Sequence, residues 1–268
     1  RRPPPPTQCL EASIRDMDLE MNNAAQGQKT LLLTGASRGI GHATAKKFAD
    51  KGWRVIGCSR QAFSPKCPWP GGARDHVQVD LSDPKMTMEA VSRVKELLGG
   101  SPLHALVNNA GVSPKGAQGE RLSTLDTDLR VWGEVFHVNF FASVVLARGL
   151  QHELSLGRGS VVNVTSIAGS RVHPFAGAAY ATSKAALAAL TREMAHDFGP
   201  LGVRVNAVAP GEVETDILSK GTDKIIATVP LRRLGQPDEV AKAIYFLCSD
   251  ESSYVSGTEI EVNGGQHV

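Results

Sequence analysis

Tyr180 and Lys184 stand four residues apart in the stretch AAYATSKAALAALTREMA, whose apolar pattern predicts a helix. At this spacing both side chains lie on one helix face. A phenol has a pKa of ~10 and is a poor proton donor or acceptor at neutral pH. A cation beside it favours the phenolate and lowers that pKa. The pair could therefore exchange a proton with a carbonyl or alcohol oxygen, although the same spacing also occurs on ordinary exposed helix faces.

The composition limits the function classes that need to be considered. The chain has 268 residues, which fits one large α/β domain, and a formal net charge of +2. A charge this close to balance gives no basic field for nucleic acid or an anionic membrane. We see no stretch near the roughly 18 apolar residues of a membrane helix. The expected partner is a small molecule, with no nucleic acid and no membrane.

The cysteines and histidines predict neither a metal site nor a disulfide framework. Cys9, Cys58, Cys67 and Cys248 form no C-x-x-C motif, and the eight histidines are scattered. We expect reduced thiols in a cytoplasmic protein.

Residues 1–28 differ from the rest of the chain. They begin with RRPPPP, which cannot join a helix or a central strand, and they continue with little apolar periodicity. They contain no apolar segment of the kind that a secretory signal needs. We expect residues 1–28 to form a flexible N-terminal extension or leader, and residues 29–268 to form the folded domain.

Short apolar runs alternate with amphipathic stretches throughout residues 29–268. Two of the predicted helices are long, Asp126–Leu154 and Ala179–Phe198. The strand candidates are KTLLLTG, WRVIGCSR, HVQVDLSD, LHALVNNAG, GSVVNVTS, VRVNAVAPG and GTEIEVNGG. Continuous apolar strands separated by helices predict a single doubly wound α/β domain, with a parallel sheet of about seven strands and helices on both faces.

The turn between the first strand and the first helix, TGASRGIG, is rich in glycine. Gly35, Gly39 and Gly41 allow a tight turn and a close approach of the backbone to a pyrophosphate, which then rests on the helix N-terminus. A glycine-rich turn is often only a loop, but a position after a strand and before a helix favours dinucleotide binding. The spacing is Gly-x-x-x-Gly-x-Gly. The domain is therefore predicted to be of the Rossmann type.

With these motifs in order, residues 29–268 resemble the short-chain dehydrogenases/reductases, in particular their non-extended members. The matching features are TGASRGIG at 34–41, NNAG at 108–111, Asn139, Ser166, YATSK at 180–184 and PGEVET at 210–215. The stretches VPLRRLGQPDEVAKAIYFLCSD and SYVSGTEIEVNGG look most like those of 3-oxoacyl-[acyl-carrier-protein] reductases. The resemblance implies an oxidoreductase acting on CH–OH donors or on the corresponding carbonyls.

The resemblance also implies catalytic roles. Tyr180 would be the acid/base, and Lys184 would lower its pKa and hydrogen-bond the nicotinamide ribose. Ser166 would hold the substrate oxygen, and Asn139 would anchor a water for proton resupply. Alone, Asn139 could be an ordinary polar helix residue.

The spacing between Ser166 and Tyr180 departs from the family pattern. Fourteen residues separate them here, where the family has thirteen. The loop GSRVHPFAG can absorb the extra residue. Thr165 and Ser170 are competing hydroxyls, and Ser166 is retained because it directly follows the apolar strand.

The resemblance places cofactor contacts along the whole domain. Asn108 would lie near the adenine ring, Asn109, Ala110 and Gly111 along the ribose, and Val213 against the nicotinamide amide. Taken without the family, Asp80 could be a helix cap, and the NNAG and PGEVET stretches could be simple loops. The implied set is Gly35, Ser37, Arg38, Gly39, Ile40, Gly41, Ser59, Arg60, Asp80, Leu81, Asn109, Ala110, Gly111, Tyr180, Lys184, Pro210, Gly211, Val213 and Thr215.

The residues after the second strand predict the cofactor. An acidic residue there would bind the ribose hydroxyls of NAD and repel a 2′-phosphate. The chain has Ser59 and Arg60 instead, and Arg38 adds a second cation. Arginine suits a phosphate through its fork of donors. We therefore expect NADP(H), with NAD(H) as the alternative and a solvated Arg60 as the plainer interpretation.

An NADP(H) preference favours reduction of a ketone to a secondary alcohol. The segment between Glu212 and Pro237 is expected to cover the substrate, a small carbonyl or alcohol compound. If that compound is linked to an acyl-carrier protein, Arg158 and Arg192 could meet the acidic carrier. The alternatives are an NAD-dependent alcohol or sugar dehydrogenase and a non-catalytic dinucleotide sensor. The family implies a homotetramer, or a homodimer, assembled through the two long helices.

Overall fold

The computed structural model describes residues 27–64, 67, 69–215, 226–227 and 229–268. Two sequence predictions concern other residues. The N-terminal extension, except for residues 27 and 28, lies outside the described residues, and so does the centre of the Glu212–Pro237 segment.

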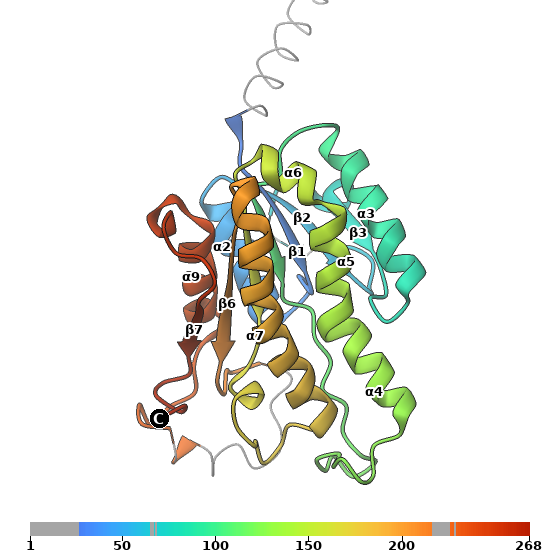
Figure 1. Ribbon diagram of the computed structural model, residues 1–268, viewed down its shortest axis with the longest axis vertical. Helices are drawn as coiled ribbons and strands as arrows, with labels where there is room; N and C mark the ends of the chain where they lie inside the picture. The colour runs from blue at the N-terminus through green and yellow to red at the C-terminus, as the bar shows by residue number, and fades with distance from the viewer. Residues whose placement is uncertain (1–26, 65–66, 68, 216–225, 228) are drawn as a thin grey trace, which may run out of the picture.

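Seven parallel strands form one sheet in the order β3-β2-β1-β4-β5-β6-β7 (Figure 1). Every residue of β1, β4 and β5 is buried, as expected for apolar strands covered on both faces. The predicted doubly wound fold is confirmed. The strands are β1 (Thr30–Thr34), β2 (Arg54–Ser59), β3 (His76–Gln78), β4 (Ala105–Asn108), β5 (Ser160–Val164), β6 (Arg204–Pro210) and β7 (Glu259–Val262).

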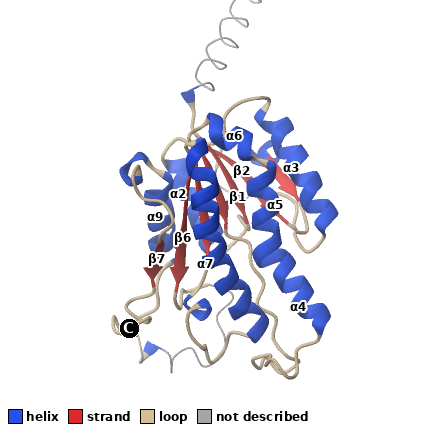
Figure 2. Ribbon diagram, in the orientation of Figure 1, coloured by secondary structure: helices blue, strands red, loops and turns tan. Residues whose placement is uncertain are grey.

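Helices cover both faces of this sheet (Figure 2). One apolar core lies beneath α3, α5 and α7, and a second lies beneath α2 and α9, which pack against each other. The α-helices are α2 (Gly39–Asp50), α3 (Pro84–Leu98), α4 (Leu129–Phe136), α5 (Ala142–Gly149), α6 (Gln151–Leu156), α7 (Ala178–Phe198) and α9 (Pro237–Cys248). The remaining helical turns are η1 (Gly72–Asp75), η2 (His137–Phe141), η3 (Ile167–Gly169), η4 (Gly199–Leu201) and η5 (Asp250–Ser252).

The predicted helix Asp126–Leu154 is the element that differs most from expectation. Its first turn begins at Leu129, because the Asp128 carboxylate accepts a hydrogen bond from the Arg130 backbone N–H at 2.7 Å and caps it there. The π-helical turn η2 then interrupts it, and Leu150 separates α5 from α6. The second long helix begins at Ala178, one residue before the predicted start.

The stretch Leu129–Gly149 also corrects the expectation about apolar segments. Among the described residues it is the one helical stretch long and apolar enough to cross a membrane by length and composition. Such a single stretch is weak evidence, because core helices meet the same test. Here α5 packs against α3, and α4 packs against α7. We therefore interpret the stretch as a helix that packs on the domain along one face, with 33% of its apolar window buried.

The described cysteines Cys58, Cys67 and Cys248 are free thiols, as expected. Burial raises the pKa of both the Cys58 and the Cys248 thiol to about 12. A thiol that holds its proton so firmly is a poor nucleophile and metal ligand. The cytoplasmic location stays a prediction.

The order of the strands positions the site. The chain leaves β1 on one side for β2 and β3, and returns on the other side for β4. In doubly wound sheets, ligands bind at the carboxyl ends of the strands where the order reverses. The turn after β1 and the turn after β4 meet at this point.

Candidate active site

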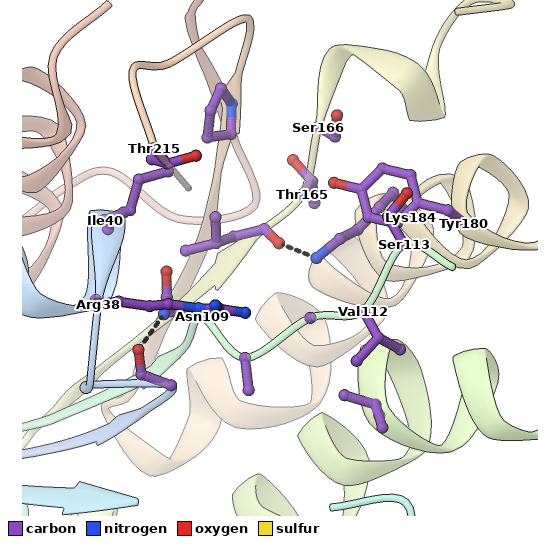
Figure 3. Close-up of a pocket in the computed structure, with 18 of the residues that line it drawn as sticks. Arg38, Ile40, Asn109, Val112, Ser113, Thr165, Ser166, Tyr180, Lys184 and Thr215 are labelled. Atoms are coloured by element: carbon purple, nitrogen blue, oxygen red, sulfur yellow. Dashed lines mark hydrogen bonds between the residues drawn. The ribbon is translucent and has the colours of Figure 1, made fainter. Parts of the chain in front are cut away.

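A cavity of about 530 Å³ opens at the carboxyl edge of the sheet (Figure 3). With the exception of Asn108, every predicted cofactor residue lines it, from Gly35 after β1 to Thr215 after β6, and so do Ser166, Tyr180 and Lys184. In Figure 3, Arg38 and Thr215 lie on one side of the cavity and Tyr180 and Ser166 on the other. Asn139 is 1 % exposed and does not line the cavity, so it can act there only through its neighbours.

The glycine turn leaves the N-terminus of α2 open to the cavity. Gly35 and Gly39 have φ values of 71° and 53°, in the left-handed region that favours glycine. A Cβ on Gly41 would lie 2.0 Å from the Gly35 carbonyl oxygen, so only glycine fits there. Arg38 at the N-cap makes no side-chain hydrogen bond to the helix. The free N–H groups of this first turn suit a phosphate.

Two side chains join the turn after β1 to the turn after β4. The Thr34 hydroxyl accepts hydrogen bonds from the backbone N–H groups of Asn109 and Ala110, both at 3.0 Å. The Asn109 amide donates to the carbonyl oxygens of Thr34 at 3.0 Å and Gly35 at 3.2 Å (Figure 3). These bonds hold the two turns, which form walls of the cavity, at a fixed separation.

Asn108 does not have the place that the resemblance implies. It is the last residue of β4, it is 4 % exposed, and its amide donates to the Asn163 side-chain oxygen at 2.9 Å inside the sheet. It is absent from the cavity lining. The Asn108 side chain is used inside the sheet by its bond to Asn163, so a contact between Asn108 and adenine is not supported.

Asp80 and Arg60, which line the end of the cavity near β2 and β3, lie close enough to interact. The Asp80 carboxylate accepts hydrogen bonds from the backbone N–H and the hydroxyl of Ser82, at 2.9 and 2.8 Å. These bonds lower the pKa of Asp80, and the charge of Arg60 lowers it further. The Ser59 hydroxyl donates to the Gln61 carbonyl oxygen at 2.8 Å. Asp80 therefore both makes the local hydrogen bonds typical of a cap and lines the cavity, so the two interpretations of this residue do not exclude each other.

The segment after β6 passes over the glycine turn. Val213 forms a parallel bridge with Gly235, in which Gly235 bonds the backbone of Glu212 and Glu214 at 2.9 Å. The N–H and C=O of Val213 itself therefore face away from this bridge. A Cβ on Gly39 would lie 3.2 Å from the Thr215 methyl carbon, so Thr215 sits directly over the turn.

Lys184 is buried at the start of α7 and reaches the end of β5. Its ammonium nitrogen donates to the Val164 carbonyl oxygen at 2.6 Å and lies 5.7 Å from the centre of the Tyr180 ring (Figure 3). Burial lowers the pKa of Lys184 to about 8. The ammonium is thus still charged at neutral pH, but its proton is far more easily lost than that of a surface lysine.

The pKa of Tyr180 moves opposite to the direction that the resemblance implies. Burial raises it, and the charge of Glu212 raises it further, whereas a hydrogen bond with Ser166 lowers it. The net shift is upward. A phenol in this environment keeps its proton at neutral pH, so in this state Tyr180 is an acid rather than a phenolate base.

Ser166 is the hydroxyl that pairs with Tyr180. Its oxygen accepts a hydrogen bond from the Ala168 N–H at 3.2 Å, at the start of η3. The Thr165 hydroxyl donates to the Val208 carbonyl oxygen at 3.0 Å, and the Ser170 hydroxyl donates to Ile167 at 3.0 Å. The two competitors are thus engaged elsewhere. The loop between η3 and α7 contains most of the GSRVHPFAG stretch, and its absorption of the longer spacing stays a prediction.

Asn139 lies in η2 and holds the wall behind Lys184. Its side-chain oxygen accepts from the Val112 N–H at 2.8 Å, and its amide donates to the Val112 carbonyl at 3.1 Å and the Ser183 hydroxyl at 3.0 Å. A Cβ on Gly111 would lie 3.4 Å from the Lys184 nitrogen and 3.5 Å from the Asn139 oxygen. Gly111 therefore lies between the two polar groups, and a Cβ there would be in ordinary van der Waals contact with both of them.

Sequence reasoning missed several charged or polar side chains in the lining, and three of them form a cluster. Lys115, His173 and Glu212 come from three separate loops, and no motif links them. Glu212 stands within the PGEVET stretch and His173 within the lengthened loop, which were the only sequence signals.

Arg158 and Arg192 do not lie near the cavity. Arg158 precedes β5, at the amino edge of the sheet, whereas the cavity is at the carboxyl edge. Arg192 is twelve residues after Tyr180 on α7, which is about 18 Å along the helix. The prediction that these two arginines meet an acidic carrier at the rim of the active site is therefore wrong.

Comparisons with known proteins agree with this geometry. The family model described as "Enoyl-(Acyl carrier protein) reductase" matches residues 35–267. The chain is 62% identical over 242 residues to protein FixR of Bradyrhizobium diazoefficiens, covering 90% of this chain and 87% of FixR. It is 34% identical over 252 residues to the 3-oxoacyl-[acyl-carrier-protein] reductase FabG of Aquifex aeolicus, covering 88% of this chain and 96% of that protein.

Solved structures show the same fold. An oxidoreductase of the short chain dehydrogenase/reductase family from Brucella ovis, in complex with a partially ordered NAD, is 59% identical with a TM-score of 0.77, covering 88% of this chain and 100% of that one. A 3-oxoacyl-[acyl-carrier protein] reductase with bound NAD from Brucella melitensis is 30% identical with a TM-score of 0.79, covering 91% and 93%. The chain therefore belongs to the short-chain dehydrogenase/reductase family of oxidoreductases.

Proposed function

We propose that this oxidoreductase transfers a hydride between NADP(H) and a carbonyl or secondary alcohol, with ketone reduction as its main direction. The observation that carries the proposal is the meeting of Ser166, Tyr180 and Lys184 in one cavity with the open N-terminus of α2. A dinucleotide on that N-terminus would extend along the cavity to the Tyr180 phenol.

The residues present fit a dinucleotide. The uncapped first turn of α2 offers N–H groups to the pyrophosphate, and the space beside Gly41 admits no side chain. The backbone N–H and C=O of Val213, which face away from the bridge with Gly235, can bond an amide group such as that of nicotinamide. When bound, the nicotinamide supplies or accepts the hydride.

The remaining chemistry belongs to the chain itself. Ser166 and Tyr180 would hold the substrate oxygen between two hydroxyl groups, and Tyr180 would give its proton to that oxygen as negative charge develops. The raised pKa of Tyr180 keeps the proton available, which supports reduction. The Lys184 charge would stabilise the phenolate that is left. We propose that a water held beside Asn139 resupplies the proton.

The adenosine end supports the choice of NADP(H). Arg38 and Arg60 line the cavity, and the residue that ends β2 is Ser59 rather than an acid. Asp80 lies nearby, but its carboxylate is already bonded to Ser82. A 2′-phosphate would therefore meet two guanidinium groups.

We also propose that the chain forms a homotetramer through α4–α5 and α7, with a homodimer as the smaller alternative. Leu129 is 83% exposed and Phe141 is 47% exposed on the first of these segments. Sedimentation at several protein concentrations tests this proposal, and a monomer at all of them would refute it.

Substitution of Tyr180 by Phe should lower kcat for ketone reduction by about 10² to 10⁴-fold, because the proton donor is lost. Binding of NADPH, followed by its fluorescence, should persist. Tyr254→Phe is the matched control, since Tyr254 is fully exposed. A Tyr180→Phe enzyme within tenfold of wild type would exclude the mechanism. Wild type that binds NADPH but reduces no ketone, sugar or acyl thioester would favour a sensor.

Substitution of Lys184 by Met should change how stability depends on pH. The pKa of Lys184 is about 8 when folded and ~10.4 when unfolded, so between these values the unfolded chain binds more protons. The free energy of unfolding of wild type should therefore rise by about 2 kcal/mol between pH 7 and pH 10, relative to Lys184→Met. Urea unfolding measures it, with Lys85→Met, at an exposed site, as control. A difference independent of pH would contradict the depressed pKa.

Substitution of Arg60 by Ala should lower kcat/KM with NADPH by about 10 to 100-fold, because a charge-assisted bond to the 2′-phosphate is lost. The value with NADH should change little. Arg93→Ala, on the exposed side of α3, is the control. If the wild-type enzyme prefers NADH, or if Arg60→Ala lowers both values equally, the assignment of NADP(H) is refuted.

A further inference from the structure

Lys115, His173 and Glu212 form a polar cluster in the same cavity that holds Tyr180. The His173 Nε2 lies 2.9 Å from a Glu212 carboxylate oxygen, and the two side chains are only 10% and 15% exposed. The Lys115 ammonium donates to the Phe175 carbonyl oxygen. The cluster and Tyr180 line one cavity, in which the charge of Glu212 raises the pKa of both Lys115 and Tyr180.

The hydrogen bonds define the proton on His173. Its Nδ1 accepts from the Phe175 N–H at 3.3 Å, so the ring proton is on Nε2, which donates to Glu212. The Glu212 carboxylate therefore accepts from His173 and has further acceptor capacity left. Lys115 carries three N–H donors, of which one is used by Phe175 within the described part of the chain.

The pair Lys115 and Glu212 presents opposite charges, so it offers no net charge to an ionic substrate group. Both side chains line the same cavity, where burial lowers the pKa of Lys115 and the charge of Glu212 acts in the opposite direction. A donor beside an acceptor suits a hydroxyl group, which can accept from Lys115 and donate to Glu212.

An acyl chain fits this half of the cavity poorly. Methylene groups placed against Lys115 and Glu212 would remove the remaining water from two charged groups and give them no hydrogen bond in return, which is costly. A hydroxyl group replaces that water without this loss. The loop that carries His173 is also held in place, because Arg121 donates to the Ala176 carbonyl oxygen at 2.8 Å.

From this arrangement we infer that the substrate is a small carbonyl compound, or its alcohol, that carries a hydroxyl group near the reacting carbon, and that this hydroxyl is bound between Lys115 and Glu212. The inference rests on the proposed function and names the substrate class of the same site.

Matched ketones test it with the full-length enzyme and NADPH. In 1-hydroxy-2-butanone a hydroxyl replaces one methyl group of 3-pentanone, and 4-hydroxy-2-butanone has the same relation to 2-pentanone. We expect kcat/KM to be about 10²-fold higher for at least one hydroxyketone than for its isostere, because an isostere leaves buried polar groups unpaired. The N-acetylcysteamine thioester of acetoacetate, an acyl probe, should be at least tenfold poorer than that hydroxyketone.

Two variants assign the preference to the cluster. Lys115→Met and Glu212→Gln should each reduce the ratio of hydroxyketone to isostere by tenfold or more. The ratio cancels any effect of Glu212 on the pKa of Tyr180, which is common to both substrates. NADPH affinity, measured by fluorescence, should stay within twofold, which also shows that the variants are folded. Lys85→Met is the exposed control.

The outcomes separate the two proposals. If isosteres or the thioester are reduced as well as the hydroxyketones, or if neither variant changes the ratio, the substrate inference is wrong and the proposed reaction stands. If wild type binds NADPH and reduces none of these carbonyls, the proposed reaction fails, and the inference that rests on it fails too.

Discussion

The hydrogen bond from the Lys184 ammonium to the Val164 carbonyl oxygen is the contact on which the site depends. It joins the first turns of α7 to the last residue of β5, and therefore fixes Tyr180 and Ser166 relative to each other. The cost is a buried cation whose pKa has fallen to about 8. A methionine would satisfy the apolar core better at this position. The Lys184 charge lies where it would stabilise a phenolate. Folding stability is therefore lower at the point where we propose the chemistry.

Two further networks hold the segments that this contact does not reach. Thr34 and Asn109 fix the turns after β1 and β4, and Asn139 fixes the segment after β4 to α7 through Val112 and Ser183. Each polar side chain here bonds backbone groups that no strand or helix can satisfy, because the strands have ended. The carboxyl edge of the sheet is therefore built by side chains, which explains why its residue types are so restricted.

Much of the fold and of the dinucleotide half of the site could be predicted from the sequence, because the signals for them lie in residues that are close together in the chain. The apolar runs and the glycine turn specify the strands, the doubly wound order and the open helix N-terminus, because each depends on neighbours in the chain. Asn108 was misplaced because its partner, Asn163, is 55 residues away. The break at η2 has no local signal in the sequence. Lys115, His173 and Glu212 come together only through the fold, so spacing could not reveal them.

The substrate half of the cavity is also where similarity to relatives is least informative. The reductases from Aquifex and Brucella melitensis are about a third identical to this chain, and the dinucleotide half of the site needs little more than glycines, an uncapped helix and the Tyr180 face of α7. Under the proposed function, those features would bind the cofactor whatever the substrate is. Specificity must instead come from groups that touch the rest of the substrate, and the candidates that we propose are Lys115 and Glu212, with His173 bonded to Glu212. The chemistry of that pair, rather than the names of relatives, is the physical guide to which carbonyl reaches Tyr180.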